Sequence, residues 1–322
     1  MATRPRTSRL RRTLLAALVA ASVAVPVSGA AGPAAVPAPA PADLGPLGSA
    51  APAALDERYA ANRAGIRAAE RTAAGHGDRR RAAVLRAMAD PGRRFLSFDG
   101  RDGGRTTEVF GDLAHAGRIA VLVPGSDTSL DAYGRLGAGA AALRRELGDS
   151  AAVVAWLGYR TPGTASHEVL TDGSAVAAAP RLASFVGELS AVRPDSRITL
   201  LCHSYGSVVC ARAAAELPVD GIVLYGSPGT GADTAGSLRT TATVWAGRST
   251  GDWIAAVPHG RIGLGFTTIG FGPDPMSPAF GAQVFDAGSG GHSDYLRPGS
   301  VPLRNMARIV NGRAASEGRH HA

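Results

Sequence analysis

The chain has 322 residues, of which 45% are apolar, so it can bury one large hydrophobic core or two smaller ones. Its formal net charge of +8 includes five arginines within the first dozen residues, and without them 29 basic residues stand against 26 acidic ones. No basic run interleaved with aromatic residues follows, so we expect no nucleic-acid partner.

The N-terminal residues 1–30 have the organisation of a secretory signal peptide. Arginines precede an apolar run over residues 13–27, and small residues lead up to Ala30, after which we expect cleavage. The run is short and contains Pro26, so we expect no stable membrane span once the leader is removed. The pair Arg11-Arg12 is compatible with a twin-arginine signal. The sequence therefore predicts a secreted or cell-envelope protein.

Two segments separate this leader from the main domain. Residues 31–53 are rich in Ala and Pro and nearly uncharged, which predicts a disordered or extended spacer. Residues 54–92 have apolar residues at helical spacing and a break at 75–77, which predicts two helices that form an N-terminal cap. An independent, solvated arginine-rich arm is the alternative for this second segment.

In residues 93–313, short apolar strands alternate with segments of helix length. We expect an antiparallel opening pair of strands, later strands, and helices between them. The strands are predicted at 95–98, 106–110, 118–123, 152–157, 197–202, 221–225, 241–246 and 282–285, and the helices at 129–147, 174–192, 205–217 and 301–311. This alternation predicts an α/β domain with a mostly parallel sheet and helices on both faces. Residues 314–322 form a polar tail.

The stretch LLCHSYGSVVC contains the candidate nucleophile. Ser204 stands between a fully apolar strand and a predicted helix, which is the position of the serine in the nucleophile elbow of hydrolases. The usual pattern is Gly-x-Ser-x-Gly. Here Cys202 replaces the first Gly, and its small side chain is compatible with a tight turn, while Gly206 keeps the second. An ordinary helix cap is the alternative role for the serine.

A nucleophilic serine needs a base, and the base needs a carboxylate that fixes its tautomer. His292 lies in a glycine-rich loop after the last predicted strand, and His259 is the second candidate for the base. Asp252 follows the strand predicted at 241–246, and Asp233 is the alternative acid. The order Ser204, Asp252, His292 is the order expected when the nucleophile sits on such an elbow.

Backbone N–H groups would stabilise the oxyanion that forms on the substrate. We expect these donors at Tyr205, directly after the nucleophile, and at Ser126, in the loop after the strand at 118–123, with Gly125 as the alternative to Ser126. Gly125, Phe266 and Phe271 are predicted to line the substrate pocket. The sequence has no metal-ligand spacing and no phosphate-binding loop, so we expect neither a metal nor another cofactor.

The two cysteines are predicted to be buried packing residues. A cysteine nucleophile would need an exposed thiolate beside a base, whereas Cys202 ends a buried strand and Cys210 lies on the helix that covers it. A disulfide between them stays open at this point, because Cα atoms on a strand and a helix can lie too far apart to be bridged.

Several motifs occur in a fixed order along residues 94–312. They are VLVPG (121–125), AWLGY (155–159), HSYGS (203–207), LYGSPG (224–229), GDWI (251–254) and GGHSDY (290–295). With this set the chain resembles an actinobacterial branch of the alpha/beta-hydrolase superfamily whose function is uncharacterised. The resemblance implies the alpha/beta-hydrolase fold and places Ser204, Asp252 and His292 at the positions of the catalytic triad. It implies no substrate.

Together these features predict an exported serine hydrolase that cleaves a small-molecule or lipid-like carboxylic ester through an acyl-enzyme on Ser204. Acyl transfer to another acceptor and amide or peptide hydrolysis are alternatives with the same triad. A non-catalytic envelope protein on the same fold is the alternative from another functional class.

Overall fold

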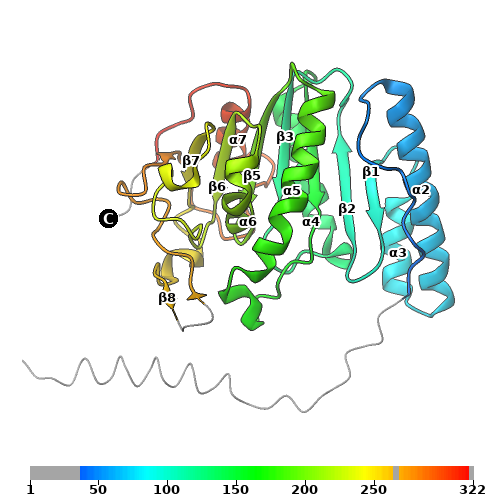
Figure 1. Ribbon diagram of the computed structural model, residues 1–322, viewed down its shortest axis with the longest axis horizontal. Helices are drawn as coiled ribbons and strands as arrows, with labels where there is room; N and C mark the ends of the chain where they lie inside the picture. The colour runs from blue at the N-terminus through cyan, green and yellow to red at the C-terminus, as the bar shows by residue number, and fades with distance from the viewer. Residues whose placement is uncertain (1–36, 264–267, 319–322) are drawn as a thin grey trace, which may run out of the picture. The chain divides into compact units, whose positions relative to one another are not determined.

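A mixed sheet of eight strands forms the centre of the computed structural model, which describes residues 37–263 and 268–318 (Figure 1). The signal peptide predicted for residues 1–30 lies outside the described residues. The strand order is β1-β2-β4-β3-β5-β6-β7-β10. The strands are β1 (Arg94–Asp99), β2 (Arg105–Phe110), β3 (Arg118–Val123), β4 (Ala151–Leu157), β5 (Arg197–His203), β6 (Gly221–Tyr225), β7 (Thr243–Gly247) and β10 (Gln283–Val284).

Strands β1 and β2 pair antiparallel, β2 is antiparallel to β4, and the remaining pairs are parallel. The predicted α/β fold with a mostly parallel sheet is therefore confirmed. Its central strands are runs of aliphatic residues because both of their faces are covered. Alternate residues of β3 belong to different hydrophobic clusters, with Val121 and Val123 on one face and Ala120 and Leu122 on the other.

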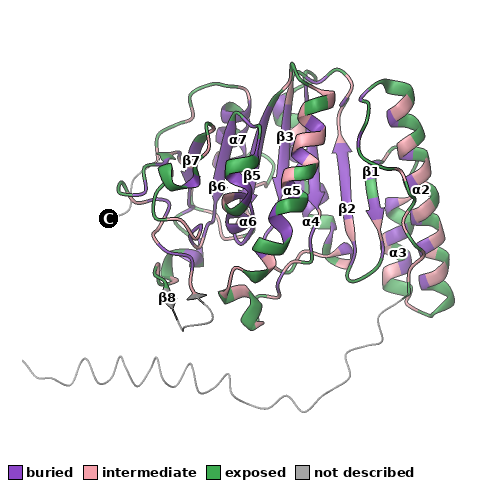
Figure 2. Ribbon diagram, in the orientation of Figure 1, coloured by how far each residue is buried: buried purple, intermediate pink, exposed green. Residues whose placement is uncertain are grey.

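Two helices cover each face of the sheet (Figure 1). Helices α5 (Gly173–Val192) and α6 (Gly206–Ala213) pack on one face, and α4 (Gly134–Leu147) and α7 (Val301–Val310) on the other. Figure 2 shows the strands buried between helices whose outer surfaces are exposed. By length and composition alone α5 could span a membrane, but its buried residues belong to the core of this domain.

Short elements complete the chain. The 3-10 helices are η1 (Leu130–Ala132), η2 (His167–Leu170), η3 (Ala214–Glu216), η4 (Gly236–Leu238) and η5 (Trp253–Ala256). A separate antiparallel pair, β8 (Ile262–Gly263) and β9 (Thr268–Ile269), was not predicted from the sequence. Residues 316–318, in the segment predicted as a polar tail, bond to β10 and its neighbours, for example through Gly318 N and the Val284 carbonyl (3.2 Å).

The N-terminal helices α2 (Pro52–Gly75) and α3 (Arg79–Met88) pack against β1 and form a third apolar cluster with Phe95 and Phe98. One ion pair adjoins this contact, because Arg93 donates both to the Ala87 carbonyl of α3 (3.2 Å) and to the Glu108 carboxylate of β2. Glu108, only 1% exposed, accepts two hydrogen bonds from Arg93 (2.6 and 2.7 Å) and a third from the Tyr133 hydroxyl (2.8 Å). In the structure the hairpin thus packs on the sheet and is not a separate arm.

Residues 37–51, within the segment predicted to be a disordered or extended spacer, run along the domain and are held by hydrogen bonds. This segment has no regular secondary structure, but the Arg58 guanidinium donates hydrogen bonds to the carbonyls of Leu44 (2.8 Å), Gly45 (3.0 Å) and Pro46 (2.7 Å). Leu47 is buried, and its N–H donates to the Glu188 carboxylate (2.7 Å). An extended Ala/Pro-rich segment forms few hydrogen bonds within itself. Its position here is fixed because Arg58 of α2 and Glu188 of α5 supply hydrogen-bond partners.

Candidate active site

The nucleophile elbow joins β5 to α6 and places Ser204 at the apex of the turn. Ser204 has a φ of 50°, a left-handed conformation that is rare for residues other than glycine and marks a strained turn. Its N–H donates to the Tyr225 carbonyl (3.0 Å) of the neighbouring strand. A Cβ atom at Gly206 would lie 2.6 Å from the Val123 carbonyl oxygen, so a side chain is excluded there.

A disulfide encloses this turn. Cys202 and Cys210 are bonded, with their Cα atoms 6.5 Å apart and both residues fully buried. The question left open by the sequence is thus answered, because the strand and the helix lie close enough for the bridge. Ser204 lies inside the loop that the bridge closes, so the strand end and the helix start are linked covalently around it.

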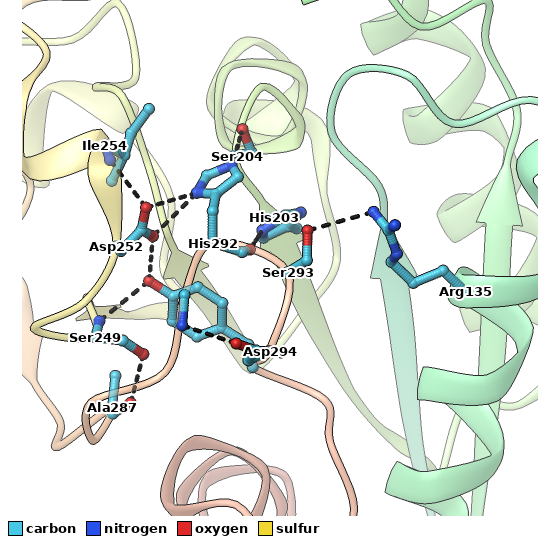
Figure 3. Close-up of polar contacts among 12 residues, drawn as sticks. Arg135, His203, Ser204, Ser249, Asp252, Ile254, Ala287, His292, Ser293 and Asp294 are labelled. Atoms are coloured by element: carbon cyan, nitrogen blue, oxygen red, sulfur yellow. Dashed lines mark hydrogen bonds and ion pairs between the residues drawn. The ribbon is translucent and has the colours of Figure 1, made fainter.

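The structure brings Ser204, His292 and Asp252 into one hydrogen-bonded chain (Figure 3). His292 Nε2 lies 2.9 Å from Ser204 Oγ, and His292 Nδ1 lies 2.9 Å and 3.0 Å from the two oxygens of Asp252. Because a carboxylate only accepts, Nδ1 carries the ring proton and Nε2 is free to accept the serine proton. All three residues follow the carboxyl ends of parallel strands, where open α/β sheets bind ligands.

Asp252 is held as an anion by more than the histidine. It is 3% exposed and also accepts hydrogen bonds from the Tyr295 hydroxyl (2.6 Å) and the Ile254 N–H (2.9 Å). Burial alone would raise the pKa of Asp252, but the hydrogen bonds from His292, Tyr295 and Ile254 outweigh it, and the pKa is lowered. No spacing in the sequence predicts this role for Tyr295, although the motif GGHSDY contains it.

The alternative acid and the alternative base are not part of the hydrogen-bonded triad. Asp233 is largely exposed and pairs with Arg261. His259 lies beside Asp274, with Nε2 3.8 Å from Oδ1, and that carboxylate also binds Arg248 (2.7 Å). Burial lowers the pKa of His259.

The loop after β3 touches the nucleophile. A Cβ atom at Gly125 would lie 2.7 Å from Ser204 Cβ, so the backbone of this loop approaches the serine as closely as a glycine allows. The next residue is Ser126, the predicted oxyanion donor. Its hydroxyl is buried and has no hydrogen-bond partner among the residues that the structure describes. Tyr205, the other predicted donor, directly follows Ser204 at the N-terminus of α6.

Residues of the segment after β4 fix this loop. The Tyr159 hydroxyl donates to the Pro124 carbonyl (2.7 Å), and the Asp127 carboxylate accepts from the Thr164 N–H (3.0 Å). The loop that carries the predicted oxyanion donor is therefore braced from outside the elbow, as a rigid donor requires.

The predicted pocket residues have different outcomes. Phe266 lies outside the described residues. Phe271 is buried and packs edge-on against the Tyr205 ring, with centroids 5.7 Å apart. Trp253, which the sequence analysis did not single out, is 52% exposed, and its ring centroid lies 4.8 Å from that of His292. A large exposed apolar ring beside the base is available to contact a substrate.

Within residues 37–263 and 268–318, no three His, Cys, Asp or Glu side chains gather as a metal site would need. The chemistry that the site supports follows from its contacts. The serine, imidazole and carboxylate are in hydrogen-bond contact, so Ser204 can transfer its proton to His292 and attack as a nucleophile.

Sequence comparison finds relatives in two mycobacteria. Over 178 residues the chain is 35% identical to uncharacterized proteins of Mycobacterium tuberculosis and Mycobacterium bovis. The alignment covers 48% of this chain and 66% of those proteins, just under two thirds of their length.

Among solved structures, the chain is similar to a lidless a/b serine hydrolase of Xanthomonas campestris, with 19% identity, a TM-score of 0.44, and coverage of 68% of this chain and 93% of that one. Esterase PE8 has 15% identity and a TM-score of 0.44 over 65% of this chain and 99% of its own. Residues 99–261 match the alpha/beta hydrolase family. The chain belongs to the alpha/beta hydrolase family.

Proposed function

We propose that this protein is a serine hydrolase that cleaves carboxylic esters through a covalent acyl-enzyme on Ser204. The observation that supports this most is the unbroken chain from Ser204 Oγ to His292 to Asp252, with contacts of 2.9 Å at both links. The strained φ of Ser204 adds to it, because unfavourable backbone conformations concentrate at functional sites.

In the proposed reaction, His292 Nε2 takes the Ser204 proton as Oγ attacks the ester carbonyl carbon. The N–H groups of Tyr205 and Ser126 stabilise the oxyanion of the tetrahedral intermediate. The C–O bond to the leaving alkoxide then breaks, and His292 protonates the alkoxide oxygen so that the alcohol is released. Water attacks the acyl-enzyme with His292 as the base, which frees the acid and restores Ser204. Asp252 keeps the ring oriented throughout.

The surroundings of the site favour a substrate with an apolar acyl or alcohol group. Trp253 presents a ring that is 52% exposed beside His292. Apolar surface of this kind contributes binding energy with groups that carry no charge. A lipid-like or small aromatic ester fits this description.

We also propose that the protein works outside the cytoplasm. The leader over residues 1–30 has the order of a signal peptide. The Cys202–Cys210 disulfide supports the same location, because structural disulfides persist in oxidising compartments.

A fluorophosphonate probe tests the reaction, because it traps only a serine that is activated as a nucleophile. We expect labelling of Ser204 in the wild type and none in Ser204→Ala. Ser207→Ala is the matched control: it removes the hydroxyl that donates to the Cys202 carbonyl (3.2 Å), and labelling should persist. Absence of labelling in the wild type, or labelling that survives in Ser204→Ala, would reject the proposal.

The bond that is cleaved is tested with p-nitrophenyl esters of increasing acyl length and with the corresponding anilides. We expect turnover of the esters and at most slow turnover of the anilides. Product analysis with and without an added alcohol separates hydrolysis from acyl transfer. Turnover of the anilides alone would replace the esterase proposal by an amidase.

A further inference from the structure

We infer that His203, the residue before the nucleophile, is a positioning residue that holds the main chain of the base His292. This inference rests on the proposed function, since it assigns a task within the same site. The His203 ring donates from Nε2 to the His292 carbonyl oxygen at 2.8 Å (Figure 3). The elbow that carries the nucleophile thus binds the loop that carries the base.

The direction of this hydrogen bond fixes the tautomer of His203. A carbonyl oxygen only accepts, so Nε2 carries the proton. The ring is enclosed by aromatic neighbours, with centroids 4.7 Å from His292, 4.9 Å from Tyr225 and 5.8 Å from Tyr295. This enclosure, together with the nearby His292 ring, lowers the pKa of His203 to about 3, so the side chain stays neutral at physiological pH.

The loop that carries His292 needs such a support. Residues 288–291 read GSGG, and Gly288 has a φ of 64°, so this approach to the base has little side-chain packing of its own. Other bonds hold this loop on either side of the base: Thr250 N donates to the Gly288 carbonyl (2.9 Å), Gly291 N donates to Asp294 Oδ2 (2.9 Å), and Ser293 Oγ accepts from Arg135 (3.3 Å). The bond from His203 acts on the main chain of the catalytic residue itself.

As a consequence, the nucleophile elbow positions both the nucleophile and the base. Ser204 and His203 are consecutive, so a shift of the elbow moves the serine and the anchor of His292 together. The contact between Ser204 Oγ and His292 Nε2 is then preserved, which matters because a displacement of about 1 Å at the reacting atoms can cost about a hundredfold in rate.

Three substitutions separate this role from simple packing. His203→Phe keeps a ring in the aromatic cluster and removes the donor. His203→Gln offers an amide N–H at about the reach of Nε2, whereas the shorter side chain of His203→Asn does not reach the carbonyl. Tyr225→Phe is the matched control, because it changes the same aromatic cluster and leaves the bond to His292 intact.

We expect His203→Phe and His203→Asn to lower kcat for a p-nitrophenyl ester about tenfold, the effect of leaving a part-buried carbonyl without its donor, with KM within about twofold of wild type. His203→Gln should restore kcat to within about threefold. A ring that only fills space would give the opposite order, with Phe the better replacement and Gln the worse. That order, or wild-type kcat in His203→Phe, would overturn the inference.

A second readout does not depend on turnover. The Nδ1 proton that His292 shares with Asp252 gives a low-field NMR signal, and we expect it in wild type and His203→Gln but shifted or broadened in His203→Phe. If the wild type hydrolyses no ester and is not labelled, the proposed function fails, while this pattern would still support the positioning role. An unchanged signal in His203→Phe would refute the positioning role whatever the activity.

Discussion

Replacing Asp252 by asparagine changes one atom of the site and removes one negative charge. In the wild type, one carboxylate oxygen accepts from His292 and Ile254, and the other accepts from Tyr295 and also lies 3.0 Å from His292. An amide has only one acceptor atom. If its NH₂ group faces Ile254, two N–H groups oppose each other. If it faces Tyr295, that hydroxyl loses its acceptor, because an NH₂ group only donates.

The magnitude follows from the charge that develops on His292. When the ring takes the serine proton, it becomes a cation whose Nδ1 lies 2.9 Å from the Asp252 carboxylate. At an effective dielectric constant of about 20, their attraction is about 6 kcal/mol. Asparagine lacks this charge. Since each 1.36 kcal/mol changes a rate about tenfold, we expect kcat/KM to fall about ten-thousandfold.

The assay is steady-state hydrolysis of a p-nitrophenyl ester by Asp252→Asn, with circular dichroism to confirm that the variant folds. Two controls are matched in chemistry. Asp294→Asn keeps an oxygen acceptor for Gly291, and Asp233→Asn changes the exposed partner of Arg261; both should stay within about twofold of wild type. The reasoning is refuted if Asp252→Asn keeps more than about a tenth of the activity, or if Asp233→Asn reproduces the loss.

Three further predictions concern the elbow. Gly125→Ala should lower kcat at least about tenfold in a folded protein, because its Cβ would stand 2.7 Å from that of the nucleophile; unchanged kcat would contradict this close approach. Replacing Cys202 and Cys210 together by alanine should reduce the free energy of unfolding, measured in urea, by about 2–3 kcal/mol, and an unchanged value would mean that no stabilising bridge forms. The pKa of His203 is lowered to about 3 in the folded protein. In the unfolded chain this histidine is protonated below about pH 6.5, whereas in the folded protein it stays neutral down to about pH 3. The free energy of unfolding therefore decreases as the pH falls through this window. His203→Gln should make this dependence on pH shallower by up to about 1.4 kcal/mol per pH unit, whereas the exposed control His167→Gln should not. Equal slopes in wild type and His203→Gln would count against a neutral His203 ring in the folded protein.

The inner strands β3, β4 and β6 could be predicted because each is largely a run of aliphatic residues that ends at a turn. The strand predicted at 118–123 has those bounds in the structure, and the one at 221–225 does too. The helix predicted at 205–217 instead ends at Ala213 and continues as a 3-10 turn. Element type thus follows from local pattern, whereas the last turn of a helix depends on what packs there.

Within the site, the strand–turn–helix context of Ser204 and the order Ser, Asp, His along the chain predicted the triad, with Asp233 and His259 left as alternatives. The role of Tyr295 could not be found in this way, because the triad pattern specifies the serine, the acid and the histidine but no further hydrogen-bond donor to the acid. The hydrogen bond from His203 to the His292 carbonyl spans 89 residues and involves a backbone atom that no motif specifies. Contacts of this kind are set by tertiary packing.

The disulfide at the elbow has a consequence for when the bond can form during folding. Cys202 and Cys210 are fully buried between β5 and α6, so no oxidant reaches their sulfurs once the helix has docked. The bond must close while the chain is still open. A chain that folds in a reducing compartment keeps two protected thiols, and a chain that folds after translocation carries the bridge. Under the proposed export, the mass of the peptide that carries both cysteines, measured after alkylation in denaturant, therefore reports whether the domain folded before or after translocation.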